Sequence, residues 1–524
     1  MTARPLMVLG TGSHAGKSLT VAALCRIFAR AGYRVAPFKA QNMSLNSAAT
    51  PDGCEIGRAQ ALQAEAAGIP PSAHMNPVLI KPGGDTSAQI VVQGKVWRTL
   101  DAHSYFGSLS TTLLPVVEES YGALAADHDL IVLEGAGSPA EINLRHSDIV
   151  NMTMARLANA PCLLVGDIDR GGVFASLLGT CELLDEDERR FIRGFIINKF
   201  RGDCSLLMPG VRMMEDRLRL PCVGVVPWLD GLDLDEEDSA GFAERAAAFS
   251  NRFSSDPAKL RIAVIAFPSI SNFTDFAPLL AEPSVSLCYL REPVELASAA
   301  IVVFPGSKQT VRDLRWLRER GFEEPLRRHI ENGGLAVGIC GGLQMLGQEV
   351  VDPKGVEGAG SERGLALLPL RTTLNPGKIT VPARGRLCEP KLFGAAIDCC
   401  DLSGYEIHMG ETEYLPEAVP FARIRRAGKP ETEIDDGCIS TDRRIFGTYL
   451  HGIFDDDVFR HAFLAAARSA LHMPEAARYF GWREHREQQL NRLADTFAAA
   501  LDLDAIYGLL NLPSPAMQQQ IVRP

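Results

Sequence analysis

A glycine-rich segment near the start of the sequence has the residue types that bind a nucleotide phosphate. It follows the apolar run 5–10 (PLMVLG) and precedes a stretch in which apolar residues recur at helical spacing. Backbone N–H groups of such a turn face an anion, and the helix that begins after it adds partial positive charge. Lys17 would reach the β- and γ-phosphates of ATP, and the Ser18 hydroxyl would bind Mg²⁺. The predicted ATP-binding residues of this segment are Gly10, Thr11, Gly12, Ser13, His14, Ala15, Gly16, Lys17 and Ser18.

The spacing of this segment differs by one residue from the common GxxxxGK[ST] pattern. That pattern would place its first glycine at position 11, where the chain has Thr11, and Gly10 stands one residue earlier. The order of strand, loop and helix, together with the GKS triplet, favours a phosphate site over a chance glycine-rich turn.

Polar side chains follow several other apolar runs of the first half, at the points where parallel strands would end. Glu134 follows DLIVL and is predicted to bind Mg²⁺ directly or through water, unless it is an exposed loop acid. Asn198 follows GFII and could contact the base of ATP or merely form a turn. Lys39 ends RVAPFK, where it would face the γ-phosphate, a substrate carboxylate or only solvent. Asp167 and Asp169 follow CLLVG, and we expect them near the substrate.

A cysteine in the second half has the surroundings of a catalytic nucleophile. Cys340 follows the apolar run GLAVGI and precedes two glycines, which allow a tight turn from strand to helix. A helix N-terminus favours the thiolate, and the N–H of Gly341 could stabilise an oxyanion. His451, at the end of another apolar run, is the candidate base, since the two side chains need only be neighbours in space. The alternative is a buried structural cysteine.

Both halves alternate short apolar runs with longer amphipathic stretches. This predicts an α/β fold with two doubly wound, mostly parallel sheets. Continuous runs such as DLIVLE and RIAVIAF are typical of strands that are buried on both faces. An acidic segment, 231–259, is predicted to link a domain at 1–230 to a domain at 260–524. A helical tail over 475–510 is expected to close the second domain.

The composition excludes several classes of protein. The 524 residues include 53 Lys and Arg against 64 Asp and Glu, a net charge of −11, which argues against a general role on nucleic acid or an anionic membrane. No apolar run approaches the roughly 18–20 residues of a membrane-spanning helix, and the first residues do not resemble a signal peptide. The 12 cysteines lack metal-site spacing and are expected to be reduced. We therefore expect a cytoplasmic enzyme.

The second half resembles the class I glutamine amidotransferase domains, which have a flavodoxin-like fold. The resemblance implies that Cys340 attacks the amide of L-glutamine and releases ammonia. It also implies that Gly306, in the segment FPGSK, supplies a second oxyanion N–H and that Gln344 binds glutamine. Many members carry a glutamate two residues after the histidine, but here that residue is Ile453. The group that orients His451 is left open between Asp455 and a main-chain carbonyl.

The first half resembles the dethiobiotin-synthetase-like ATP-dependent ligases, which share the longer phosphate loop. Segments such as PFKAQNMSLNS, DIDRGGVFA, NKFRGD and YLHGIF extend the resemblance to the glutamine-hydrolysing corrin ligases of cobalamin synthesis. This family resemblance implies ATP and Mg²⁺ as cofactors, L-glutamine as the nitrogen donor and a corrin as the small-molecule partner. It implies amidation of the b, d, e and g carboxylates of cobyrinic acid a,c-diamide. It suggests that Gln41 and Asn42 contact the corrin and that Glu55 is a second metal ligand.

Three other functions remain open from the sequence. One is the branch of the same family that amidates the a and c carboxylates, although that branch is expected to lack DIDRGGVFA and NKFRGD. A second is a non-corrin ligase, such as one that amidates a lipid-linked cell-wall precursor, although its two halves would normally be separate chains. The third is a partitioning-type P-loop ATPase, which usually carries an extra lysine early in the loop; residues 10–15 have none.

Overall fold

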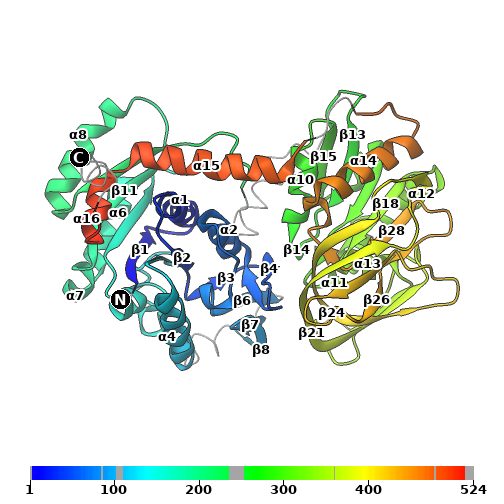
Figure 1. Cartoon of the computed structure of the whole chain (residues 1–524), viewed down its shortest axis with the longest axis horizontal. Helices are drawn as coiled ribbons and strands as arrows, with labels where there is room; N and C mark the ends of the chain where they lie inside the picture. Colours follow the sequence, from blue (N-terminus) through cyan, green and yellow to red (C-terminus); the bar gives the residue numbers. More distant parts are fainter. Residues whose placement is uncertain are drawn as a thin grey trace, which may run out of the picture.

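Two α/β bodies lie side by side, and one long helix crosses from the second body to the first (Figure 1). The computed structural model describes residues 3–83, 87–101, 110–234, 253–358, 360–476 and 480–513. Most of the predicted linker, residues 235–252, lies outside the described part. Among the described residues, no helix is both long and apolar enough to cross a membrane.

The first body is built on a six-stranded parallel sheet, as the continuous apolar runs predict. Its strands follow the order β12-β11-β10-β1-β9-β2. Their bounds are Cys222–Pro227, Ile192–Phe200, Cys162–Asp167, Arg4–Gly10, Leu130–Glu134 and Val35–Phe38. The predicted helix after the glycine-rich segment is α1 (Lys17–Arg30), and Gly32, with φ of +89°, follows its end. The carboxyl ends of β1, β9 and β10 therefore meet around this segment.

Two small sheets and a helix lie between this large sheet and the second body (Figure 1). One sheet has the order β3-β6-β7-β8 and the other pairs β4 with β5. These strands are Gln41–Met43, Val78–Gly83, Ser87–Val92, Lys95–Asp101, Ser47–Ala49 and Glu55–Gly57. Helix α2 (Arg58–Ala67) follows β5 and packs against α1.

The second body contains a sheet of order β15-β13-β16-β18-β28-β27, parallel except for β27. Its strands are Val285–Leu290, Leu260–Ile265, Ile301–Phe304, Leu335–Ile339, Ile445–Thr448 and Cys438–Ile439. The first five have the chain order 2-1-3-4-5, which is the flavodoxin-like order. The fold-class prediction, two doubly wound and mostly parallel sheets, is thereby confirmed.

A second sheet of this body was not expected. Its main path is β20-β19-β21-β24-β29, and it is built around the long antiparallel pair β21 (Leu370–Leu387) and β24 (Asp401–Tyr414). Polar residues and glycines separate the apolar residues of both strands, and β21 also contains prolines, so they lack the continuous apolar character of the parallel strands. Strand β29 (Leu450–His451) pairs with β24, so this sheet fixes the backbone of His451.

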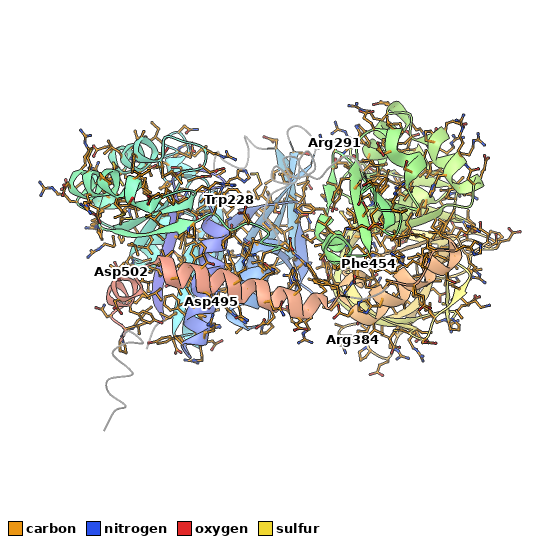
Figure 2. The ribbon with its side chains drawn as sticks, turned by 90° about the horizontal axis from the view of Figure 1, so that it is seen from above. Trp228, Arg291, Arg384, Phe454, Asp495 and Asp502 are labelled. Carbon is orange, nitrogen blue, oxygen red and sulfur yellow. The ribbon has the colours of Figure 1, made fainter. Side chains whose placement is uncertain are left out.

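The tail of the chain is helical, as predicted, but it packs on the first body. It forms α15 (Trp482–Ala500) and α16 (Leu503–Leu509). Leu490, Leu493 and Phe497 join the apolar cluster formed by α1 and the parallel sheet. Figure 2 shows Asp495 on the part of α15 that runs along the first body. The prediction that this tail closes the second domain is therefore wrong, because the apolar face of α15 covers α1 and β12 instead.

We expect Phe497→Ala to lower the free energy of unfolding by about 3–5 kcal/mol, because the buried ring would leave a cavity in this cluster. The control is Asp495→Ala on the same helix, where the exposed Asp495–Arg30 ion pair contributes at most about 1 kcal/mol. Urea unfolding followed by circular dichroism measures both. Equal small effects would contradict the packing of α15 on the first body.

Candidate active sites

The glycine-rich segment forms a loop that holds Lys17 inside the first body. Lys17 Nζ donates to the carbonyl oxygens of Gly12 at 2.8 Å and of Gly137 at 3.0 Å. A side chain at Gly10 would come within 3.0 Å of Lys17, so this glycine leaves room for the lysine. The ammonium thus lies between the loop and the end of β9, where it can meet phosphate oxygens.

Glu134, at the end of β9, is the centre of a buried polar cluster beside the loop. Its Oε1 accepts from Ser18 Oγ at 2.8 Å and from Lys39 Nζ at 3.0 Å. Its Oε2 accepts from Gln63 Nε2 at 2.6 Å, and Gln60 Nε2 lies 3.4 Å away. Both glutamines come from α2, and the sequence analysis did not single them out. The oxygens of Ser18 and Glu134 suit Mg²⁺, which usually takes one or two protein ligands beside phosphate and water.

Residues at the ends of β10 and β11 hold the phosphate loop in place. Asn198 Nδ2 donates to the Ala15 carbonyl at 3.0 Å, and a side chain at Gly16 would collide with this nitrogen. Lys199 Nζ donates to the His14 carbonyl at 2.7 Å and to Asp167 at 2.8 Å. Asn198 is therefore a support of the loop, and its contact with a base stays a prediction.

The predicted metal ligand Glu55 has other partners. Both carboxylate oxygens of Glu55 are bonded to lysine ammonium groups, those of Lys81 and Lys378. Burial would raise the pKa of Glu55, but these two lysines hold it well below its ordinary value. Two neighbouring cations do not suit a metal ligand, so this prediction is not supported.

Asn42 and Asp169 are also engaged within the protein, and Gln41 is half-buried in β3. Asn42 is buried and donates to Gln60 Oε1 at 2.8 Å, so it supports the Glu134 cluster, and its contact with a corrin stays a prediction. Asp169 pairs with Arg201 at 3.3 Å at the surface. Two of the residues predicted to contact substrate, Lys39 and Asp167, lie instead beside the phosphate loop, where Lys39 bonds to Glu134 and Asp167 to Lys199.

Cys340 stands on a strained turn between β18 and α13 (Gly341–Leu346). Its φ and ψ are +53° and −109°. Residues with a side chain rarely adopt this backbone conformation, and the surrounding structure must hold Cys340 in it. A side chain at Gly342 would collide with the Phe304 carbonyl, which explains the glycine there. The turn places the buried thiol at the start of α13, the position that the sequence predicts for a nucleophile.

His451 is held by a residue that the sequence analysis did not identify, Asp275 of the short helix η4 (Phe273–Phe276). His451 Nδ1 lies 2.6 Å from Asp275 Oδ2, and Asp275 Oδ1 accepts from the N–H of Gly452 at 3.0 Å. Burial would lower the pKa of His451, but Asp275 and Cys340 raise it to about 10. Cys340, His451 and Asp275 thus have the arrangement expected of a nucleophile, a base and an orienting carboxylate, and these roles stay a prediction.

The predicted oxyanion and glutamine-binding residues surround this triad. A side chain at Gly306 would lie 3.2 Å from the ring of His451, and one at Gly341 would lie 2.8 Å from the backbone nitrogen of Ser307. The two glycine segments therefore meet beside the histidine. Gln344 is buried on α13, where its amide donates to the Met409 carbonyl at 3.1 Å and to Tyr449 Oη at 3.2 Å.

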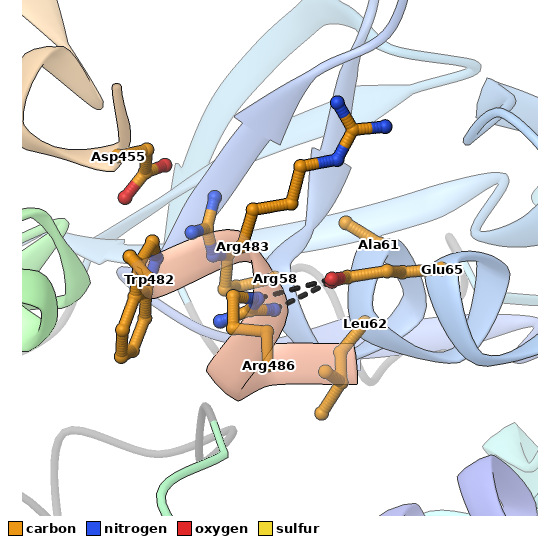
Figure 3. A pocket seen from close by; sticks show the side chains of 8 residues that line it. All are labelled: Arg58, Ala61, Leu62, Glu65, Asp455, Trp482, Arg483 and Arg486. Atoms are coloured by element: carbon orange, nitrogen blue, oxygen red, sulfur yellow. Dashed lines mark hydrogen bonds and ion pairs between the residues drawn. The ribbon is translucent and has the colours of Figure 1, made fainter. Parts of the chain in front are cut away.

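Asp455, one of the two expected partners of His451, lies instead on a pocket of about 320 Å³ between α2 and the start of α15 (Figure 3). The pocket is lined by Arg58, Ala61, Leu62, Glu65, Asp455, Trp482, Arg483 and Arg486. Figure 3 also shows the bidentate ion pair of Glu65 with Arg486.

We expect Asp275→Asn to reduce kcat for glutamine hydrolysis by about 10²–10⁴-fold, because an amide cannot hold the imidazolium in place. The substitution removes the largest contribution that raises the pKa of His451, so the alkaline limb of the pH–rate profile should move to lower pH. Initial rates between pH 6 and 11 measure both effects. The matched control is Asp455→Asn, which should keep the wild-type profile; the reverse pattern would assign the orienting role to Asp455.

Two family models match separate parts of the chain. Residues 6–240 match the family described as "CobQ/CobB/MinD/ParA nucleotide binding domain", and residues 261–459 match the "CobB/CobQ-like glutamine amidotransferase domain". Fold and sites thus define a P-loop nucleotide-binding domain joined to a glutamine amidotransferase domain, the organisation of a glutamine-hydrolysing ligase.

Proteins named cobyric acid synthase resemble the chain along its whole length. Those of Desulforudis audaxviator, Chloroflexus aggregans and Sorangium cellulosum are 48%, 47% and 47% identical. The alignments cover 98%, 97% and 97% of this chain and 100%, 100% and 99% of theirs. The chain belongs to the cobyric acid synthase family.

Proposed function

We propose that the chain converts cobyrinic acid a,c-diamide, or its adenosyl form, to cobyric acid by amidating the b, d, e and g carboxylates. The observation that carries the proposal is the similarity to cobyric acid synthases over the whole chain. The phosphate loop with Glu134 and the triad of Cys340, His451 and Asp275 supply the two chemistries that such a reaction needs.

In the ligase reaction, a carboxylate oxygen of the corrin attacks the γ-phosphorus of ATP, and ADP leaves. Lys17 would stabilise the negative charge that develops on the phosphate. Ser18 and Glu134 would hold Mg²⁺, which neutralises phosphate charge. Ammonia then attacks the carbonyl carbon of the acyl phosphate, inorganic phosphate leaves, and the proton lost from nitrogen goes to solvent. Lys39 is proposed to face the γ-phosphate, and Asp167 to fix the loop through Lys199.

In the glutaminase reaction, the Cys340 thiolate attacks the side-chain amide of glutamine. The N–H groups of Gly341 and of the Gly306 segment would stabilise the oxyanion, and Gln344 is proposed to help bind glutamine. His451 gives its proton to the leaving ammonia, and Asp275 keeps the imidazolium in place. Water then hydrolyses the glutamyl thioester to glutamate, and His451 acts as the base in this second half.

The experiment that tests the proposal is product analysis. The chain is incubated with ATP, Mg²⁺, glutamine and cobyrinic acid a,c-diamide, and mass spectrometry counts the amidated carboxylates. Four new amides support the proposal. Activity on cobyrinic acid that stops at the a and c amides would assign the chain to the sister branch. ATP hydrolysis that does not respond to any corrin would indicate a P-loop switch.

A further inference from the structure

One strand of the first body, here called the ligase body, contacts the residues that hold His451 in the second body, here called the amidotransferase body. Ser47, the first residue of β4, is fully buried at the junction of the two bodies. Its N–H donates to Oδ1 of Asn272 at 3.0 Å, and its carbonyl oxygen lies 3.5 Å from Tyr405 Oη. Both partners belong to the amidotransferase body, so a single residue of the ligase body contacts two of its elements.

Both elements hold His451. Asn272 directly precedes η4, the short helix that carries Asp275, and it is itself buried with φ of +52°. On its other side, Ser271 pairs with Gly306 of the proposed oxyanion segment. The ring of Tyr405 stacks on the ring of His451, with centroids 5.5 Å apart and an angle of 22° between the planes. A shift of Ser47 would therefore act on the orienting carboxylate and on the stacked ring together.

Ser47 is fixed in turn by a buried charge cluster that spans the junction. Its Oγ donates to Glu55 Oε1 at 2.8 Å and accepts from Lys81 Nζ at 2.9 Å. Lys378 of the amidotransferase strand β21 completes the pairing of Glu55. Breaking one partner of a buried ion pair leaves an uncompensated charge, which is strongly unfavourable. The cluster therefore ties the position of β4 to the docking of the two bodies.

We propose that β4 of the ligase body positions the catalytic histidine of the amidotransferase, with Asn272 and Tyr405 as the positioning residues. The inference rests on the proposed function, in which Cys340 and His451 hydrolyse glutamine. The segment 39–47 runs from Lys39, bonded to Glu134 at the nucleotide site, to Ser47 at the junction. The rate of glutamine hydrolysis therefore depends on the position of the ligase body, because a small displacement of His451 lowers that rate strongly.

The test is Asn272→Gly, since glycine tolerates the positive φ and removes only the acceptor for Ser47. We expect kcat for glutamine hydrolysis to fall about 10–100-fold with KM unchanged, and the alkaline limb of the pH profile to move to lower pH as Asp275 loosens. Amidation supplied with ammonium chloride should stay at the wild-type rate. Tyr405→Phe keeps the stacked ring and removes the hydroxyl near Ser47, and it should lower the same kcat to a smaller extent.

The matched control is Glu65→Gln, which weakens an ion pair between α2 and the crossing helix α15 but contacts neither Ser47 nor η4. It should keep all wild-type rates. Wild-type kcat and pH profile in Asn272→Gly would overturn the inference, as would an equal loss of ammonium-dependent amidation. If Asn272→Gly does not fold, Tyr405→Phe decides by the same two readouts. Cys340→Ala in the same assay separates the two proposals: if it still hydrolyses glutamine, the proposed function itself fails.

Discussion

Replacing Cys340 by alanine is expected to abolish amidation from glutamine, by at least about 10³-fold, and to leave amidation from ammonium intact. Cys340 supplies the only sulfur at the turn where β18 meets α13, and no other described side chain there can form a thioester. Free ammonia needs only the ligase site, whose groups come from the first body. The measurement compares corrin amidation with glutamine and with ammonium chloride at equal protein concentration.

The control for this experiment is Cys438→Ala. Cys438 is also buried, in the strand β27 next to β28, and burial raises the pKa of its thiol to about 11, so it stays protonated at neutral pH. This variant should retain both activities. If Cys340→Ala uses glutamine as well as the wild type does, Cys340 is not the nucleophile. If it loses both nitrogen sources, its effect is on the fold.

Lys17→Ala has the second large expected effect, a loss of at least about 10³-fold in amidation from glutamine and from ammonium alike. Its ammonium lies between the loop carbonyl of Gly12 and that of Gly137, so it is in place to stabilise the transferred phosphate. Glutamine hydrolysis measured without ATP should persist, because the triad lies in the other body. ADP release and corrin amidation are the two readouts.

The exposed Lys95→Ala of β8 is the control for a general loss of positive charge from the ligase body, and it should behave as the wild type. The melting temperature of Lys17→Ala should match that of the wild type within a few degrees. Amidation that survives in Lys17→Ala with either nitrogen source would show that the glycine-rich loop does not bind the reacting phosphate.

Sites built from neighbouring residues were predictable from the sequence, whereas contacts between distant segments were not. The loop before Lys17 and the turn at Cys340 depend on glycines within a few positions, so local spacing is informative. Asp275 lies 176 positions before His451, and nothing beside it marks a catalytic residue. The family resemblance suggests Glu55 as a metal ligand, and the sequence around it does not reveal its lysine partner Lys378, which is 323 positions away.

The two errors in the fold have related causes. The apolar residues of the long strands β21 and β24 are separated by polar ones, some of which are buried, such as Glu406 and His408, so they do not form the continuous runs that predict the parallel strands. The amphipathic pattern of α15 predicts that the helix has a buried face but not which body covers it. Both questions depend on tertiary contacts between segments that are far apart in the chain.

The position of α15 and α16 also has a consequence for how the protein is made. Phe28 of α1 contacts Tyr507 of α16 edge to face, with ring centroids 5.6 Å apart, and the N–H of Asp502 bonds to the Val223 carbonyl of β12. A ribosome adds about 5–20 residues each second, and it synthesises the entire second body before α15 and α16. The apolar cluster of the first body therefore stays uncovered during that time. A fragment that ends at the acidic segment would therefore expose the apolar face of α1 and β12. Its native state requires α15 and α16, supplied either on the same chain or as a separate fragment.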